Sequence, residues 1–254
     1  MDCMANKREQ ILGQHMLVNS EIIDYEVAMA RPEKKTVLEM GGGTGNLTAA
    51  LAENAKQVIT IEIDPIMIKE LQNRFKGKRK IRIIEGDFLE IPANKYKIDI
   101  IVGNIPYSAS SSILFKLREW KFDLALLCVQ KEFAERMIAK SGDRNYSRLS
   151  IMSQLYFTIR YLRTVPKTCF DPIPEVDSAI IMLFSKNEKV NEQRDKLITK
   201  LFVHRKKTLA AALKSREFTE NEKDGILSKA EKMNLLKRRV FRMTSEEIIE
   251  ITKN

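Results

Sequence analysis

The stretch TVLEMGGGTGNLT, residues 36–48, decides the fold of this chain. Five residues with strand character lead into a run of glycines, and a helical segment follows directly. Glycine allows the backbone to turn tightly and to approach a ligand closely, as in the first strand-to-helix turn of nucleotide-binding sheets. A dinucleotide-binding turn would continue with a glycine at position 46, where this chain has Asn46, so the turn argues against NAD.

Strand-like and helical segments alternate outward from this turn. The strand-like runs are 36–40, 57–63, 81–86, 98–104 and 124–130. They are apolar throughout and do not alternate with polar residues, which indicates a parallel sheet covered by helices on both faces. We therefore predict an α/β fold with a Rossmann-like, doubly wound, mostly parallel sheet, whose ligands bind beyond the carboxyl ends of the strands.

Two acidic residues follow at the ends of the next two strand-like runs. Glu62 lies 19 residues after Gly43, where a carboxylate can accept hydrogen bonds from both ribose hydroxyls of a cofactor. Asp87 follows the third run and can accept from an adenine amino group, with Phe88 beside the ring. This order and spacing resembles the class I S-adenosylmethionine-dependent methyltransferases. We therefore expect S-adenosylmethionine as the methyl donor.

The segment Asn104-Ile105-Pro106-Tyr107 ends the fourth run and resembles the (Asn/Asp/Ser)-x-Pro-(Tyr/Phe/Trp) motif of methyltransferases that act on exocyclic amino groups. The amino nitrogen of adenine is a poor nucleophile because its lone pair is delocalised into the ring. The side-chain oxygen of Asn104 and the carbonyl of Ile105 can accept hydrogen bonds from this amine and increase its electron density. Pro106 stiffens the turn, and Tyr107 offers a face for base stacking.

The cysteines and histidines indicate neither a nucleophile nor a metal site. Cytosine-C5 methylation needs a cysteine in a Pro-Cys setting, whereas Cys128 falls within an apolar run and Cys169 lies outside any such motif. Cys3, Cys128 and Cys169 are far apart, and His15 and His204 have no clustered acids around them. We therefore expect a reducing compartment, no disulfide framework and no metal.

Five further stretches point to one family: GQHML (13–17), QKEFAER (130–136), YSRLS (146–150), FDPIPEVDSA (170–179) and HRKKTLAAAL (204–213). Together with LEMGGGTGNLT and GNIPY, they resemble the small-subunit ribosomal RNA adenine dimethyltransferases of the KsgA type. The resemblance extends from about residue 10 to about residue 245. It implies dimethylation of two adjacent adenines in the 3′-terminal hairpin of small-subunit ribosomal RNA, within immature small subunits.

The resemblance also implies roles for individual residues. Phe170 is expected to stack on a flipped adenine opposite Tyr107, because an extruded base needs two apolar faces to replace its lost stacking. Asn104, Pro106, Tyr107 and Phe170 are the expected catalytic residues. Met16 stands where the family usually has an aromatic residue, so different packing is expected near the donor. The expected donor contacts are His15, Leu17, Gly41, Gly43, Glu62, Ile63, Asp87, Phe88 and Asn104.

The pattern changes after Gln130. Helical segments at 131–140 and 147–157 are followed by strand-like runs at 158–165 and 178–184 and a polar linker at 185–193. Residues 188–254 are helical in character and carry 17 basic and 11 acidic residues, a net charge of +6. We predict a catalytic domain over residues 1–186 and an all-helical, basic, RNA- or ribosome-binding domain over 187–254. The expected phosphate contacts are Arg205, Lys206, Lys207, Lys237, Arg238 and Arg239.

The charge of the whole chain agrees with a polyanionic partner. Its 254 residues include 44 basic and 34 acidic residues, a net charge of +10. The N-terminal residues do not resemble a signal peptide, and the longest wholly apolar run, 124–129, is too short to cross a bilayer. We therefore expect a soluble, cytoplasmic protein, and a monomer.

Three alternatives remain open. The erythromycin-resistance methyltransferases of large-subunit ribosomal RNA share the GNIPY-type motif, but FDPIPEVDSA and YSRLS are closer to the small-subunit branch. The second alternative is a ribosome-assembly factor whose catalysis is secondary or lost. The complete set of Gly41, Glu62, Asp87, Asn104 and Tyr107 argues against lost catalysis. The third, a small-molecule methyltransferase, would leave the basic C-terminal segment without a purpose.

Overall fold

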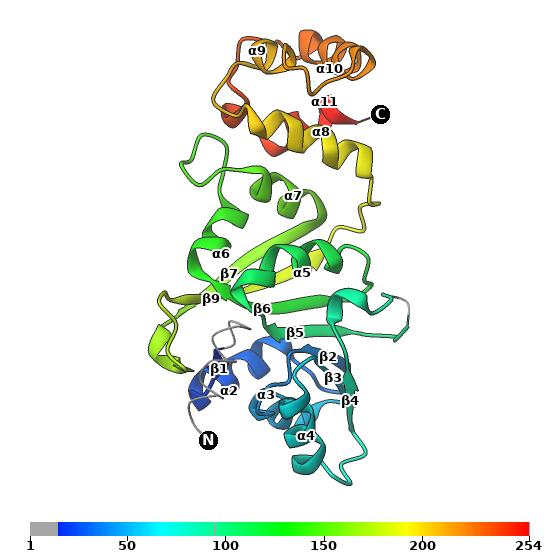
Figure 1. Cartoon of the computed structure of the whole chain (residues 1–254), viewed down its shortest axis with the longest axis vertical. Coiled ribbons are helices and arrows are strands. Elements are labelled where there is room, and N and C mark those ends of the chain that lie inside the picture. The colour runs from blue at the N-terminus through cyan, green and yellow to red at the C-terminus, as the bar shows by residue number, and fades with distance from the viewer. Residues whose placement is uncertain (1–14, 94, 254) are drawn as a thin grey trace. The chain divides into compact units, whose positions relative to one another are not determined.

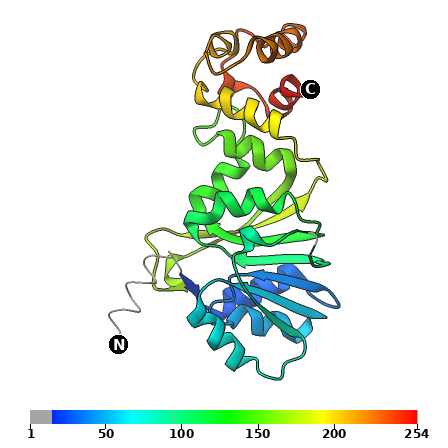
Figure 2. The same cartoon turned by 45° about the vertical axis from the view of Figure 1, so that its right-hand side comes forward.

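The computed structural model describes residues 15–93 and 95–253, shown from two sides in Figures 1 and 2. The chain forms two compact units. The sheet unit comprises the chain up to Ala134 together with Arg160–Ser185. The helical unit comprises Glu135–Ile159 together with the chain from Lys186. Gly13, Gln14 and Cys3, which the sequence singled out, lie outside the described residues.

A seven-stranded sheet forms the core of the sheet unit. Its strands are β2 (Thr36–Met40), β3 (Gln57–Glu62), β4 (Ile81–Glu85), β5 (Ile100–Asn104), β6 (Leu124–Gln130), β7 (Phe157–Val165) and β9 (Ser178–Ser185). They are arranged in the order β4-β3-β2-β5-β6-β9-β7. The first five are mutually parallel, and β9 is antiparallel to β6. The predicted α/β fold with a mostly parallel sheet is confirmed.

Both faces of the central strands are buried, which explains the mainly apolar runs in the sequence. Neighbouring residues along a strand point to opposite faces, and yet Val37 and Leu38 in β2 are both 0% exposed. One face packs in a common hydrophobic core with helices α2 (Ser20–Ala30) and α3 (Asn46–Asn54). The other helices wholly within the sheet unit are α4 (Pro65–Arg74) and α5 (Ser110–Leu117), with 3₁₀ turns at Phe88–Glu90, Tyr107–Ala109 and Lys167–Cys169.

The strand order reverses between β2 and β5. From β2 the chain proceeds outward through β3 to β4, and it then continues on the other side of β2 with β5 and β6. At such a reversal, the connections leave the two strands in opposite directions, and a crevice opens beyond their carboxyl ends. The glycine turn after Met40 and the side chain of Asn104 both lie at this point of the sheet.

A two-stranded sheet adds the N-terminal segment to the same end of the unit. In it, β1 (Met16–Leu17) pairs antiparallel with β8 (Phe170–Asp171). Next to this pair, Nδ1 of His15 lies 2.8 Å from the carbonyl oxygen of Pro172. The pairing brings His15 and Phe170 to the same place from distant parts of the chain. The sequence did not indicate it, because a strand of two residues has no recognisable periodicity.

The helical unit contains α7 (Arg148–Tyr156), α8 (Glu192–Val203), α9 (Leu209–Leu213), α10 (Glu220–Lys232) and α11 (Ser245–Thr252), and the end of α6 (Lys131–Ile138). The sequence indicated one boundary, at 186/187, whereas the chain passes between the units at 134/135, 159/160 and 185/186. Within the part of the chain that the structure describes, no helix is both long and apolar enough to span a membrane.

The assignment of residues 135–159 to the helical unit has a clear physical basis. Helix α7 packs against α8 and α11. The hydroxyl of Tyr146 donates a hydrogen bond to the carbonyl of Met243, and Ser245 donates to the side-chain oxygen of Gln154. Nearly every residue of α7 is buried, so this helix needs partners all round. The C-terminal helices supply them.

Candidate active site

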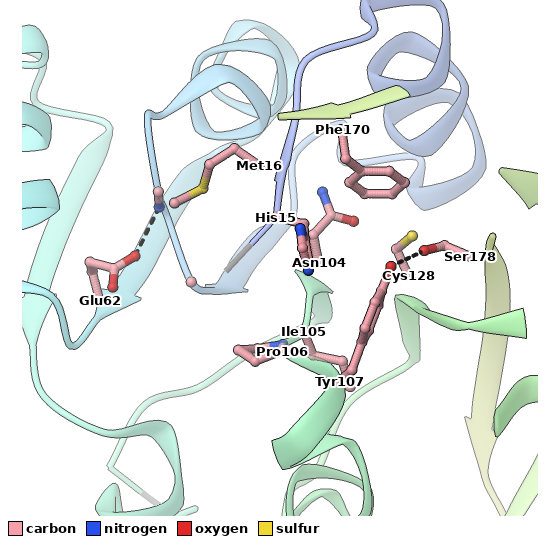
Figure 3. A pocket seen from close by; sticks show the side chains of 12 residues that line it. His15, Met16, Glu62, Asn104, Ile105, Pro106, Tyr107, Cys128, Phe170 and Ser178 are labelled. Atoms are coloured by element: carbon pink, nitrogen blue, oxygen red, sulfur yellow. Dashed lines mark hydrogen bonds between the residues drawn. The ribbon is translucent and has the colours of Figure 1, made fainter. Parts of the chain in front are cut away.

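Three adjoining pockets lie at the carboxyl ends of the parallel strands. We call them the Asn104 pocket, drawn in Figure 3, the glycine pocket and the Asp87 pocket. The Asn104 pocket shares Gly43 with the glycine pocket and Glu62 with the Asp87 pocket. Each predicted catalytic or donor-binding residue lines at least one of the three: His15, Leu17, Gly41, Gly43, Glu62, Ile63, Asp87, Phe88, Asn104, Pro106, Tyr107 and Phe170.

The glycine turn after β2 provides a wall made of backbone. Gly41 and Gly43 have φ values of 76° and 49°, in the left-handed region that residues with a side chain rarely adopt. A Cβ atom at Gly43 would lie 2.6 Å from the sulfur of Met16, whose side chain extends towards this turn in Figure 3. The conformation at position 43 therefore favours glycine, and a larger residue would also displace the flexible side chain of Met16.

Glu62 is held by three backbone amides at the end of β3. Its Oε2 accepts a hydrogen bond from the Gly43 amide at 2.9 Å, and Oε1 accepts from Ile63 and Asp64 at 2.8 and 2.9 Å. Since each carboxylate oxygen has two lone pairs, Oε2 retains the capacity to accept from a further donor. The carboxylate thus joins the glycine turn to β3 and still offers an acceptor to the pockets that it lines.

The Asp87 pocket, of about 270 Å³, combines apolar walls with two acidic residues, Glu62 and Asp87. Oδ1 of Asp87 accepts from the Leu89 amide at 2.8 Å, which orients the carboxylate and leaves Oδ2 as a second acceptor. The ring of Phe88 stacks on Trp120, with centroids 5.3 Å apart, so core packing fixes its position. Apolar faces next to the free oxygen of Asp87 suit a purine ring that carries an amino group.

Asn104 presents a buried oxygen that has no partner. Its Oδ1 makes no hydrogen bond to any of the described residues. The buried carboxyl group of Glu26 in α2 lies near this side chain, and its Oε2 is also without a partner among the described residues. A buried acceptor without a partner costs about 1–3 kcal/mol, so such groups are rare in folded proteins and call for an explanation. A ligand that donates a hydrogen bond in this pocket provides one.

Two aromatic rings line the Asn104 pocket from different elements. Tyr107 follows β5, and its hydroxyl lies 2.8 Å from Oγ of Ser178 at the start of β9. Burial raises the pKa of Tyr107, so the hydroxyl is neutral, and the Ser178 contact orients its ring. Phe170 comes from β8, and the ring of His15 lies 5.5 Å from that of Tyr107. Figure 3 shows these side chains around Asn104.

Cys128 also lines this pocket, in addition to its place in the core of the sheet. Burial raises the pKa of its thiol well above the ordinary value, and the nearby Glu26 carboxyl raises it further. Since the thiolate is the nucleophilic form of cysteine, the protonated thiol is inert at neutral pH. The structure thus argues, as the sequence does, against methyl transfer through a cysteine nucleophile.

Comparison with known proteins identifies the family. Residues 5–250 match the family model described as ribosomal RNA adenine dimethylase. This chain belongs to the ribosomal RNA adenine dimethylase family. It is therefore a methyltransferase, and the family and enzyme class expected from the sequence are confirmed.

Three known proteins are similar to this dimethylase over most of its length. A probable ribosomal RNA small subunit methyltransferase A from Thermococcus gammatolerans is 40% identical over 243 residues, which cover 94% of this chain and 86% of that protein. The structure of a dimethyladenosine transferase from Plasmodium falciparum is 33% identical with a TM-score of 0.84, covering 93% and 96%. The 23S rRNA methyltransferase ErmE is 26% identical with a TM-score of 0.70, covering 93% and 98%.

The basic clusters of this dimethylase lie side by side in the helical unit. The amide of Val240 donates to the carbonyl of Lys207 at 3.1 Å, and the amide of Leu209 donates to that of Arg238 at 2.8 Å. These hydrogen bonds join the two segments that the sequence singled out separately. The exposed members are Lys206, Lys207, Lys237 and Arg239, and we call them the basic surface.

The other two predicted phosphate contacts are engaged within the protein. The Arg205 guanidinium donates to the carbonyl of Tyr146 at 2.6 Å. Arg238 forms an ion pair with Glu247 and donates to the carbonyl of Arg242. Both side chains therefore have a structural role. Among the described residues, no group of three or more histidine, cysteine or acidic side chains is placed to hold a metal ion.

The sequence did not predict that Cys128 or Ser178 lines the Asn104 pocket, or that Glu26 lies near it. Glu26 carried a signal, because it lies on the same helical face as Ile22 and Ile23, where an acidic residue is unexpected. Ser178 is part of the FDPIPEVDSA stretch, but its contact with Tyr107 depends on the position of β9. Such contacts follow from the tertiary structure and have no local pattern.

Proposed function

We propose that this protein transfers methyl groups from S-adenosylmethionine to the N6 amino groups of two adjacent adenines in the 3′-terminal hairpin of small-subunit ribosomal RNA, within immature small subunits. The observation that carries the reaction is the buried, unpartnered Oδ1 of Asn104 in a pocket lined by Tyr107 and Phe170. The choice of subunit is supported by the identity of 40% to the small-subunit relative, against 26% to ErmE.

The pockets fit the methyl donor, which supplies an electrophilic methyl group on a sulfonium. Glu62 retains an acceptor for a ribose hydroxyl, and Asp87 retains one for the adenine amino group. Ile63 and Phe88 line the apolar walls of the Asp87 pocket, where the adenine ring would lie. We assign the remainder of the donor to residues of the other two pockets, namely His15, Leu17, Gly41, Gly43 and Asn104.

Asn104 acts on the attacking amine. Its Oδ1 accepts a hydrogen bond from the amino group, with the Ile105 carbonyl as the second acceptor, and both shift electron density onto the nitrogen. The amine is then held in line with the methyl group, and such positioning can lower a barrier by about 7–11 kcal/mol. No general base is needed, because the methylated amine is strongly acidic and its proton leaves to water.

Tyr107 and Phe170 hold the adenine after it leaves its stack. Each aromatic face that stacks on a base contributes about 1–3 kcal/mol. The Ser178 contact fixes the direction of the Tyr107 ring, and Pro106 restricts the turn between Asn104 and Tyr107. The basic surface of Lys206, Lys207, Lys237 and Arg239 supplies phosphate contacts, which strengthen binding without selecting a sequence.

The test is methyl transfer from labelled S-adenosylmethionine to unmethylated, immature small subunits, followed by nucleoside analysis of the RNA. We expect dimethyladenosine at two adjacent positions near the 3′ end. Transfer to naked large-subunit RNA and none to small subunits would assign the protein to the erythromycin-resistance type. Donor binding without transfer to either RNA would make an assembly role the better explanation.

A further inference from the structure

We propose that the segment 171–177, which we call the pocket rim, contacts the RNA bases next to the adenine that enters the Asn104 pocket. This inference rests on the proposed function, and it adds a binding surface for the neighbouring nucleotides. The rim is the chain between Phe170 and Ser178, and both of these side chains line the pocket in Figure 3. An adenine that lies between Tyr107 and Phe170 therefore brings its neighbours in the RNA close to the rim.

The rim carries two exposed apolar side chains. Ile173 is 61% exposed and Val176 is 45% exposed, whereas Phe170 and Ala179, on either side of the rim, are buried. Single apolar residues are common on protein surfaces, but two within four residues at the mouth of a binding pocket favour an apolar partner. A base that has lost its stacking neighbour is such a partner, and side chains such as isoleucine fill gaps between bases in nucleic-acid complexes.

The rim is fixed at both ends, so its apolar side chains are presented in a defined position. Strand β8, which leads into the rim, pairs with β1. At the other end, the side chain of Asp177 accepts a hydrogen bond from the amide of Lys167 at 3.0 Å. Between these ends, Pro172 and Pro174 restrict the backbone on both sides of Ile173. A surface that is ordered before binding loses less conformational entropy when its partner arrives.

The charge of the rim favours bases over phosphates as its partner. The rim contains three acidic residues, Asp171, Glu175 and Asp177, and no basic residue. Asp171 and Glu175 are exposed. Their carboxylates repel the phosphate backbone but can accept hydrogen bonds from the amino groups of bases. The rim therefore suits the unstacked bases of an RNA loop, whereas the basic surface supplies the phosphate contacts.

Ile173→Ser tests the larger of the two apolar contacts. We expect kcat/KM for methyl transfer to immature small subunits to fall about tenfold, because an isoleucine side chain is no longer buried against a base. Ile173→Leu keeps an apolar side chain of similar size and should stay within about threefold of the wild type. Donor affinity, measured by calorimetry, and the thermal midpoint should be unchanged in both variants, because Ile173 is exposed and lines none of the three pockets.

A pair of valines provides the matched control. Val176→Ser alters the rim and should lower kcat/KM about threefold, less than Ile173→Ser because valine is smaller. Val190 is 43% exposed, close to the 45% of Val176, but it belongs to the helical unit. Val190→Ser should therefore leave kcat/KM unchanged. Equal kcat/KM for Ile173→Ser and the wild type, or the same loss in Val190→Ser as in Val176→Ser, would overturn the proposal.

Photocrosslinking identifies the partner of the rim directly. Ile173→Cys in a Cys3→Ser background can be labelled with an aryl azide, because Cys128 and Cys169 are buried, and irradiated on immature small subunits. We expect primer-extension stops within a few nucleotides of the target adenines. Crosslinks mainly to ribosomal protein, to distant RNA or to a second copy of this chain would refute the base contact. If the wild type methylates no RNA, the proposed function fails, and crosslinks to bases of the 3′-terminal hairpin would still support the rim contact.

Discussion

The Asn104 pocket and the basic surface of the helical unit contrast in how their groups are held. In the pocket, Glu62 accepts hydrogen bonds from three amides, the hydroxyl of Tyr107 contacts Ser178, and Oδ1 of Asn104 is buried. The basic surface consists of exposed side chains whose charges act through solvent. Removing one buried group leaves its partners unsatisfied, whereas exposed charges are screened and contribute small, nearly additive amounts. Single substitutions should therefore affect the two regions very differently.

The largest effect should come from Asn104→Ala. We expect kcat to fall at least a hundredfold, about 2.7 kcal/mol of lost transition-state stabilisation, because the amine loses its side-chain acceptor. Donor binding, measured by calorimetry, should be partly retained. Turnover close to that of the wild type would remove the proposed role of Asn104, and with it the contrast between the two regions.

The buried carboxyls should also make stability depend on pH. Burial raises the pKa of Glu26 to about 8 and that of Glu39 to about 7, from an ordinary value of 4.5. The folded state therefore binds more protons than the unfolded state between about pH 4.5 and 8, and stability should fall as pH rises through this window. The expected slope is at most about 1.4 kcal/mol per pH unit for each group. Denaturant unfolding, measured at several pH values, should show that the free energy of unfolding declines less steeply with pH in Glu26→Gln than in the wild type. Equal slopes for the two proteins would contradict this.

Glu62→Ala should weaken donor affinity about tenfold, or roughly 1.4 kcal/mol, because it removes the proposed ribose acceptor. It also removes the acceptor of three backbone amides, so the thermal midpoint should fall as well. Glu62→Gln, which keeps one side-chain oxygen, is the matched control. Its donor affinity and thermal midpoint should lie between those of the wild type and Glu62→Ala. Donor binding in Glu62→Ala that equals the wild type, measured by calorimetry on folded protein, would refute the ribose contact.

The smallest effects should come from the basic surface. Replacing Lys206 and Lys237 by serine should weaken RNA binding and reduce the slope of log affinity against log salt by roughly 1 for each lysine. At saturating RNA, kcat should stay unchanged. Lys56→Ser with Lys69→Ser, which alters exposed lysines of the sheet unit, is the control for net charge. An equal loss of RNA affinity in the control pair would mean that the basic surface acts only through the total charge of the protein.

Much of the sheet unit could be predicted because the sequence patterns that indicate its strands and turns are local. The runs 36–40 and 124–130 were predicted with the bounds that the structure has, and the others agree within a few residues. The parallel arrangement aligns the carboxyl ends of the strands, so residues at those ends meet at one edge. Glu62, Asp87 and Asn104 could therefore be grouped before any coordinates were known.

The parts that could not be predicted depend on long-range contacts. The β1–β8 pair involves two residues on each side, too few to leave a pattern. Arg205 and Arg238 are as basic in sequence as Lys206 and Lys237, and only the fold shows that Tyr146 and Glu247 engage them.

The chain passes between its two units three times, and this limits how the protein can be divided or recombined. A fragment that begins at residue 187 would lack α7, and a protein truncated after Ser185 would expose the face of α7 that α8 and α11 cover. Exchange of the helical unit between relatives would have to include 135–159 and preserve all three junctions with the sheet unit. We therefore expect RNA recognition in this family to change through substitutions on the surface and not through exchange of the helical unit.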